Sequence, residues 1–71
     1  MKTLDVTGLS CPEPVVRTLA ALNKLAAGES LAVLADTATA RDNVLRIAAN
    51  QGCTATAETI DGQFRITVSK P

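Results

Sequence analysis

The four residues Cys11-Pro12-Glu13-Pro14 constrain the fold most strongly, because they fix where a helix begins and place a thiol at that point. Proline is favoured at the first helical position, where its fixed φ suits the helix and its missing N–H would be unpaired anyway. We therefore predict that Pro12 is the first helical residue and that Cys11 is the N-cap. Because Pro12 and Pro14 supply no N–H, Glu13 is the free donor of that first turn.

A sulfur in this position favours the thiolate form, since it faces the Glu13 N–H and the positive end of the helix dipole. Cysteines at helix N-termini can have pKa values lowered from about 8.5 to between about 3.5 and 7.5. The Glu13 carboxylate opposes this effect, and Arg17 is placed one turn later to pair with Glu13. The alternative is a small apolar cysteine at an ordinary helix start. We favour a reactive thiol, because Cys is not a preferred cap residue and the better cap Ser10 is adjacent.

The size and composition limit the fold to one small core. A chain of 71 residues predicts a single domain, residues 1–71, that buries only about 60% of the surface its unfolded chain would expose. Phe64 is the one aromatic residue, so the core must be aliphatic and we expect no ring-shaped cofactor. Seven basic and seven acidic residues give a net charge of zero, which argues against strong binding of nucleic acid. Arg17 and Lys24 share a helix face, which we interpret as solvated rather than as a phosphate site.

The chain contains no histidine, which excludes Cys-His catalysis, a histidine general base and histidine metal ligands. Cys11 and Cys53 are far apart in the sequence and do not form a Cys-x-x-Cys site, so we expect neither structural zinc nor thioredoxin-type exchange. We find no targeting segment and no apolar run of transmembrane length. These features predict a cytoplasmic protein with reduced thiols, no metal and no membrane partner.

The first half of the chain reads as strand, helix, strand. Alternating residues predict a strand from Thr3 to Val6, and helical spacing predicts a helix from Pro12 to about Ala26 that Gly28 terminates. Residues 31–35 are apolar without alternation, as in a strand at the centre of a sheet. The predicted inner face of the helix consists of Val15, Leu19, Leu22 and Ala26, widened by Val16 and Leu25.

The second half reads as helix, strand, strand. The chain turns over residues 36–40, where Thr39 and Asp42 resemble a capping pair for a second helix that ends at Gly52. A third strand is predicted over residues 53–59, a hairpin turn at Asp61-Gly62, and a short last strand that is a candidate for an exposed sheet edge. The predicted inward-facing residues are Val44, Ile47, Ala48 and Gln51 in the helix and Phe64, Ile66 and Val68 in the last strand.

This order predicts a two-layer α/β sandwich, β-α-β-α-β-β, with two helices on one face of a four-stranded mixed sheet. Two segments, Gly8-Leu9-Ser10-Cys11-Pro12-Glu13-Pro14 and residues 35–42, Ala-Asp-Thr-Ala-Thr-Ala-Arg-Asp, resemble the TusA/SirA-like sulfur-carrier family. The resemblance covers residues 4–70, and residues 43–52 look more like its YedF-like or generic SirA-like branch than like the tRNA-thiolation member. That family has the same two-layer fold.

The resemblance implies a sulfur carrier. Its motif cysteine, matched by Cys11, receives a sulfane sulfur as a persulfide from a cysteine desulfurase or rhodanese-like donor and passes it to an acceptor protein. The family serves tRNA thiolation, molybdenum-cofactor maturation and sulfur oxidation. Such a protein acts as a co-substrate more than as a turnover enzyme and needs no cofactor. Gly8, Pro12, Glu13 and Pro14 would orient the thiol, while Arg17 and Arg41 are possible modulators.

Several readings stay open at this stage. Arg41 is expected to contact a partner or the neighbouring loop, and we favour a helix-dipole role for Asp42. Cys53 is more simply a half-buried small residue than a resolving thiol. The competing functions are a non-catalytic interaction or regulatory module and a Cys11/Cys53 thiol redox protein, which requires the two Cα atoms within about 7 Å. An RNA-binding domain is disfavoured by the neutral charge and the single aromatic residue.

Overall fold

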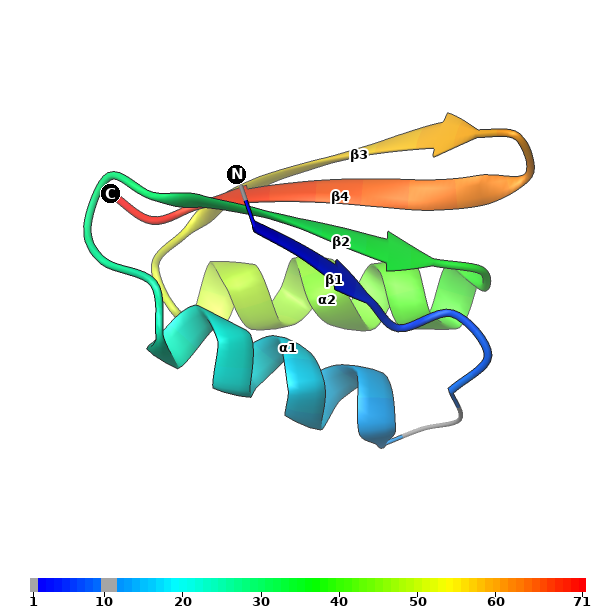
Figure 1. The fold of residues 1–71 in the computed structure, drawn as a ribbon, viewed down its shortest axis with the longest axis horizontal. Coiled ribbons are helices and arrows are strands. Elements are labelled where there is room, and N and C mark those ends of the chain that lie inside the picture. Colours follow the sequence, from blue (N-terminus) through cyan, green and yellow to red (C-terminus); the bar gives the residue numbers. More distant parts are fainter. Residues whose placement is uncertain (1, 10–11) are drawn as a thin grey trace.

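Four strands and two helices follow one another in the predicted order over residues 2–9 and 12–71, which the computed structural model describes. The elements are β1 (Lys2–Asp5), α1 (Glu13–Asn23), β2 (Ser30–Ala35), α2 (Ala38–Asn50), β3 (Thr54–Ile60) and β4 (Gln63–Ser69). Met1, Ser10 and Cys11 lie outside the described residues. Both helices cover the same face of the sheet (Figure 1), which confirms the predicted two-layer architecture.

The strand order is β1-β2-β4-β3, and the sheet is mixed. The β1 strand pairs with β2 in parallel, whereas β4 pairs antiparallel with both β2 and β3. The expectation that the last strand lies at an edge is therefore wrong, because the hairpin from β3 returns β4 to a place beside β2. Asp61 and Gly62 form the hairpin turn with φ values of 51° and 77°, the left-handed conformations that this two-residue turn requires.

The core lies between the sheet and the helices. Ile66 and Val68 of β4 are fully buried and Phe64 is partly buried against them, which confirms the predicted alternation of this strand. The central position of β2 explains its continuous apolar sequence, because even Ala32, between the core residues Leu31 and Val33, is only 3% exposed. The other core residues with no exposure are Val6, Val33, Ala35, Val44 and Ala48.

The buried face of α1 matches the predicted one only in part. Pro14, Thr18 and Leu22 face the core, whereas Val16 and Leu19 are 55% and 36% exposed. The predicted inner face was based on the spacing of the large apolar side chains. In the structure the smaller side chains of Pro14 and Thr18 also lie against the core. Of the predicted inward-facing residues, Leu22 and Leu25 are buried and Val15 is partly buried against the core, whereas Val16, Leu19 and Ala26 are exposed.

The α1 helix also ends at Asn23, earlier than the predicted Ala26. Lys70, near the other end of the chain, donates from Nζ to the carbonyl oxygens of Leu22 at 3.2 Å and Leu25 at 2.9 Å. A cation at this position satisfies carbonyls that a helix end leaves unpaired and complements the negative end of its dipole. The Gly28 N–H donates to the Lys70 carbonyl at 2.8 Å, which fixes the turn that follows.

The α2 helix is capped by Thr37, two residues before the predicted Thr39. The Thr37 hydroxyl accepts the Ala40 N–H at 3.1 Å, and its extended backbone ends the preceding loop. Asp42 consequently lies beyond the first turn, so the predicted dipole role for its carboxylate is wrong. The inner face consists of Ala40, Val44, Ile47 and Ala48, with Ala40 in place of the predicted Gln51, which is exposed as the C-cap residue.

We predict that Lys70→Met lowers the free energy of unfolding by about 1.5 kcal/mol, because two α1 carbonyls lose a charged donor in a partly buried setting. Thermal unfolding followed by circular dichroism measures the change. The matched control is Lys2→Met, which removes an exposed lysine and should change stability by less than about 0.5 kcal/mol. Equal stability of the two variants would contradict the capping role of Lys70.

A buried hydroxyl gives a second prediction. Thr18 is fully buried, and its Oγ1 has no hydrogen-bond partner among the described residues. Replacing the hydroxyl with a methyl group in Thr18→Val should raise the free energy of unfolding by about 1 kcal/mol. Thr18→Ala, which also removes buried methyl contact, should lower it. A Thr18→Val variant less stable than the wild type in denaturant unfolding would show that the hydroxyl is satisfied.

Candidate functional site

One end of the molecule collects the segments that the sequence analysis selected. The strands β1 and β2 end there, α1 and α2 begin there, and the hairpin between β3 and β4 turns at the same end (Figure 1). This arrangement follows from two crossovers on one sheet face, which return each helix start to the carboxyl ends of the strands. Cys11 itself lies outside the described residues, but Leu9 and Pro12 on either side of the gap belong to this end.

The first turn of α1 begins one residue later than predicted. Glu13 is the first helical residue and Pro12 is the N-cap, because the Pro12 carbonyl accepts the first helical hydrogen bond from the Val16 N–H at 3.0 Å. The prediction that Cys11 is the N-cap is therefore wrong. Pro14 is then the second helical residue and has no N–H. The backbone N–H groups of the first turn that lack an acceptor within the helix are those of Glu13 and Val15. The helix start offers two donors instead of one.

The side chains of the motif divide between core and solvent. Pro14 is buried and fixes the start of α1 on the core, while Pro12 and Glu13 are exposed. The expected pair between Glu13 and Arg17 is present, with 3.2 Å between Oε2 and Nε and about half of each side chain exposed. An exposed pair of this kind contributes little to stability, but it places a positive charge beside the Glu13 carboxylate.

Two aspartates hold the turn between β1 and α1. Gly8 has a φ of +75°, as its predicted role in a tight turn requires, and its N–H donates to Asp36 Oδ2 at 3.0 Å. Asp5 accepts from the Thr7 hydroxyl at 2.6 Å and from the Thr7 N–H at 2.9 Å. Both bonds lower the pKa of the Asp5 carboxyl from its ordinary value, and the bond from the Thr7 hydroxyl has the larger effect.

Asp36 is the functional candidate that the sequence analysis missed. Its carboxylate links the loop after β2 to the turn after β1, across 28 positions of sequence. The sequence analysis placed Asp36 only in a turn. Its position directly after the buried strand β2 is the sequence signal that could have identified it. An acidic residue there lies at the same end of the sheet as the preceding strand's loop.

Arg41 lies over the ring of Phe64, with 4.7 Å between Cζ and the ring centroid, in cation–π contact. Its Nε also pairs with Asp42 Oδ1 at 2.9 Å. Arg41 therefore connects α2 to β4, which is a contact within the chain that differs from the expected one with the neighbouring loop. The side chain remains about one-third exposed.

Cys53 lies at the opposite end of the molecule. It follows α2, where its N–H donates to the Ala48 carbonyl at 2.9 Å, and its side chain packs partly buried against the core. The thirteen residues of α2 span about 20 Å between this end and the end that holds Leu9 and Pro12 (Figure 1). This placement disfavours a disulfide with Cys11 within one molecule and agrees with a packing role for Cys53.

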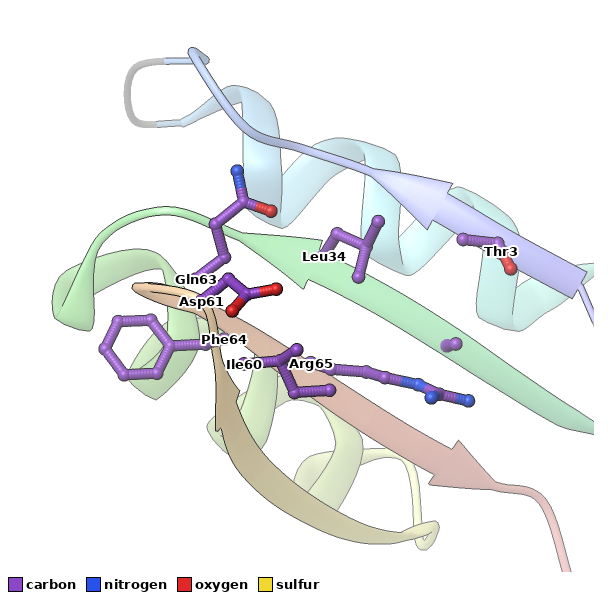
Figure 2. A pocket seen from close by; sticks show the side chains of 8 residues that line it. Thr3, Leu34, Ile60, Asp61, Gln63, Phe64 and Arg65 are labelled. Atoms are coloured by element: carbon purple, nitrogen blue, oxygen red, sulfur yellow. The ribbon is translucent and has the colours of Figure 1, made fainter.

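A hollow of about 350 Å³ lies on the sheet face that the helices leave open (Figure 2). Leu34 and Arg65 lie along it, and Asp61 and Gln63 border it near the hairpin. Its lining has no nucleophilic thiol and no group that the motif positions. Within residues 2–9 and 12–71, no three metal-ligating side chains lie close enough to hold an ion. No helix in the same ranges has the length and apolar character needed to cross a membrane.

Comparisons with known proteins agree with this geometry. The family model for sulfurtransferase TusA matches residues 2–70. A protein of Methanocaldococcus jannaschii named "Putative sulfur carrier protein MJ0990" is 46% identical over 99% of this chain and 95% of its own length. A Halobacterium salinarum protein, also named a "Putative sulfur carrier protein", is 62% identical over 48% of this chain and 42% of its own. The crystal structure of the SirA-like protein from Desulfitobacterium hafniense superposes with a TM-score of 0.86 at 34% identity, covering 96% of this chain and 95% of that one.

The Asp36 link can be tested by removing its acceptor. We predict that Asp36→Ala lowers the free energy of unfolding by about 1 kcal/mol and speeds hydrogen exchange of the Gly8 amide, because that N–H loses its partner. NMR-detected exchange measures the effect at this single amide. Asp42→Ala removes an exposed carboxylate at the same end of the molecule and should leave the Gly8 amide unchanged. Equal protection of Gly8 in Asp36→Ala and wild type would disprove the link.

Proposed function

Because the chain belongs to the TusA sulfurtransferase family, we propose that it carries sulfur as a persulfide on Cys11. The sulfur comes from a cysteine desulfurase or rhodanese-like donor and passes to an acceptor protein. The observation that carries this proposal is the Cys-Pro-Glu-Pro motif within a family match that spans nearly the whole chain. The sulfur-carrier names of the two archaeal relatives support the same function.

The transfer step is an exchange at sulfur. The Cys11 thiolate attacks the outer sulfur of a donor persulfide, a new S–S bond forms on Cys11, and the donor S–S bond breaks. The donor cysteine leaves as a thiolate, so electrons and atoms balance without an external oxidant or reductant. The same exchange in reverse order delivers the sulfur to an acceptor thiolate. The rate depends on the thiolate fraction of the attacking sulfur and on its access.

The start of α1 supplies an environment suited to such a sulfur. The N–H groups of Glu13 and Val15 and the positive end of the helix dipole favour an anion in front of the helix. The pairing of Glu13 with Arg17 at 3.2 Å offsets the nearby carboxylate charge. We assign Pro12 and Pro14 to holding this helix start, and Gly8 to the turn that leads into the motif. Arg41, engaged by Phe64 and Asp42, is assigned to positioning α2.

A carrier must also dock so that its sulfur reaches the partner's cysteine. Val16 and Leu19 lie exposed on α1, within two turns of the motif, and Pro12 is exposed on the same side at helical spacing. Exposed apolar residues next to a reactive group indicate a contact surface for another protein. We propose that donor and acceptor proteins bind this outer side of α1. We also propose that the acceptor belongs to a sulfur-trafficking pathway such as tRNA thiolation or molybdenum-cofactor maturation.

Intact-mass spectrometry tests the carrier function directly. After incubation with a cysteine desulfurase and cysteine, we expect the wild type to gain one sulfur atom that a reductant removes. Cys53→Ser should gain the same sulfur, because Cys53 follows the C-terminal end of α2, whereas the motif precedes α1 at the opposite end of the molecule. Cys11→Ser should gain none while keeping the wild-type circular dichroism spectrum.

Two results would contradict the proposal. Sulfur gain in Cys11→Ser would assign the persulfide to another residue. The absence of any gain in folded wild type with both desulfurase and rhodanese donors would favour the non-catalytic interaction module, for which Cys11→Ser keeps its activity in cells.

A further inference from the structure

A groove of about 290 Å³ lies between the outer edge of the sheet and the first helix. Its apolar lining comes from both layers, and three cationic side chains border it. The apolar residues are Leu4, Ala20, Ala21 and Leu31, and the cationic residues are Lys2, Arg17 and Lys24. The groove is therefore an apolar depression with a basic rim.

The three cations come together only in the fold. Arg17 and Lys24 lie on α1, and Lys2 reaches the same groove from β1. The strand and the helix run in opposite directions (Figure 1), so Lys2 and Lys24 lie at one end of the groove and Arg17 lies toward the other. The sequence analysis interpreted Arg17 and Lys24 as a solvated helix face. It did not predict that Lys2 lies beside them.

The rim has little internal compensation. Of the two ion pairs found within residues 2–9 and 12–71, only that of Arg17 with Glu13 touches the groove, and it is half exposed. Lys2 and Lys24 have no carboxylate within ion-pair distance in these residues. A negatively charged ligand would meet two lysines without ion pairs at one end of the groove, and toward the other end Arg17, which it would share with Glu13.

The edge of β1 offers backbone groups as well. β1 is an edge strand, with β2 on its inner side. The Val6 N–H donates to the Leu34 carbonyl at 2.9 Å, and successive residues of a strand alternate in direction, so Thr3 directs its N–H and C=O away from β2. Edge strands can receive an extended peptide through such groups. Thr3 also lines the groove, so an added strand would lie along it.

We propose that this groove binds an extended acidic segment of a partner protein. Apolar side chains at the centre of the segment would pack on Leu4 and Ala20, and carboxylates at its ends would pair with the lysines and with Arg17. A polynucleotide fits less well, because the groove floor is apolar and its lining includes no aromatic side chain for base stacking. The zero net charge of the chain also gives little general attraction for phosphates. The surface goes beyond the proposed function, since it needs no sulfur on Cys11.

Fluorescence anisotropy with a synthetic probe tests the groove. The probe is a fluorescein-labelled heptapeptide of the sequence glutamate, aspartate, valine, isoleucine, valine, aspartate, glutamate. We expect saturable binding that weakens with added salt and that weakens about tenfold in the double variant Lys2→Glu/Lys24→Glu. Ala20→Glu should also weaken binding, because it places a charge on the groove floor. The single variant Lys24→Glu should also weaken binding. Arg46→Glu is its matched control, since it makes the same change of charge at an exposed α2 residue outside the groove, and it should bind as the wild type does.

Three results would overturn the proposal when circular dichroism shows the variants folded. One is equal loss of binding in Arg46→Glu and in Lys24→Glu, which make the same change of charge, because this would indicate general charge attraction. Another is no saturable binding of the heptapeptide by wild type. The third is tighter binding of a labelled oligothymidylate that the same Lys2 and Lys24 changes abolish, which would make the groove a nucleic-acid site. Cys11→Ser should bind the heptapeptide normally, so a failure of this proposal is distinguishable from a failure of sulfur transfer.

Discussion

The burial of a single sheet face beneath two helices is the constraint on which the rest of the structure depends. A chain of 71 residues can build one such core, and it does so with aliphatic side chains such as Val33, Val44 and Ile66, all fully buried. Both crossovers must then lie on the same face. As a result α1 and α2 begin at one end, where β1 and β2 finish, and Pro12, Glu13 and Pro14 of the motif belong to that end because of the packing.

The first helix serves three surfaces at once. Its inner side, with Pro14 and Leu22, completes the core, and its outer side exposes Val16 and Leu19 near the motif. Its third side, which includes Arg17, forms the basic groove with β1. The proposed sulfur chemistry and the proposed partner recognition therefore occupy different parts of the helix, the first at its start and the second along its length. The Asp36 bond to Gly8 holds the preceding turn in relation to this helix.

Much of the fold could be predicted because its signals are local. The element order, the alternation in β4 and the Glu13–Arg17 pair depend on spacings of two to four residues. The Asp61-Gly62 turn depends on the φ values that these two residues tolerate. The burial of Thr18 in place of Leu19 was not predictable from periodicity. The Thr18 hydroxyl faces the core with no partner among residues 2–9 and 12–71, while Leu19 remains more than one-third exposed.

By itself the sequence determined the fold class, the order of the elements, the family and the cysteine of the proposed chemistry, because each of these is written in short motifs and local spacing. Tertiary structure alone decided the central place of β4, the Lys70 contacts with α1, the Asp36–Gly8 bond and the arrival of Lys2 beside Arg17. The physical reason is that these contacts join residues far apart in the chain. They exist only when burial of the common core has already brought the two layers together.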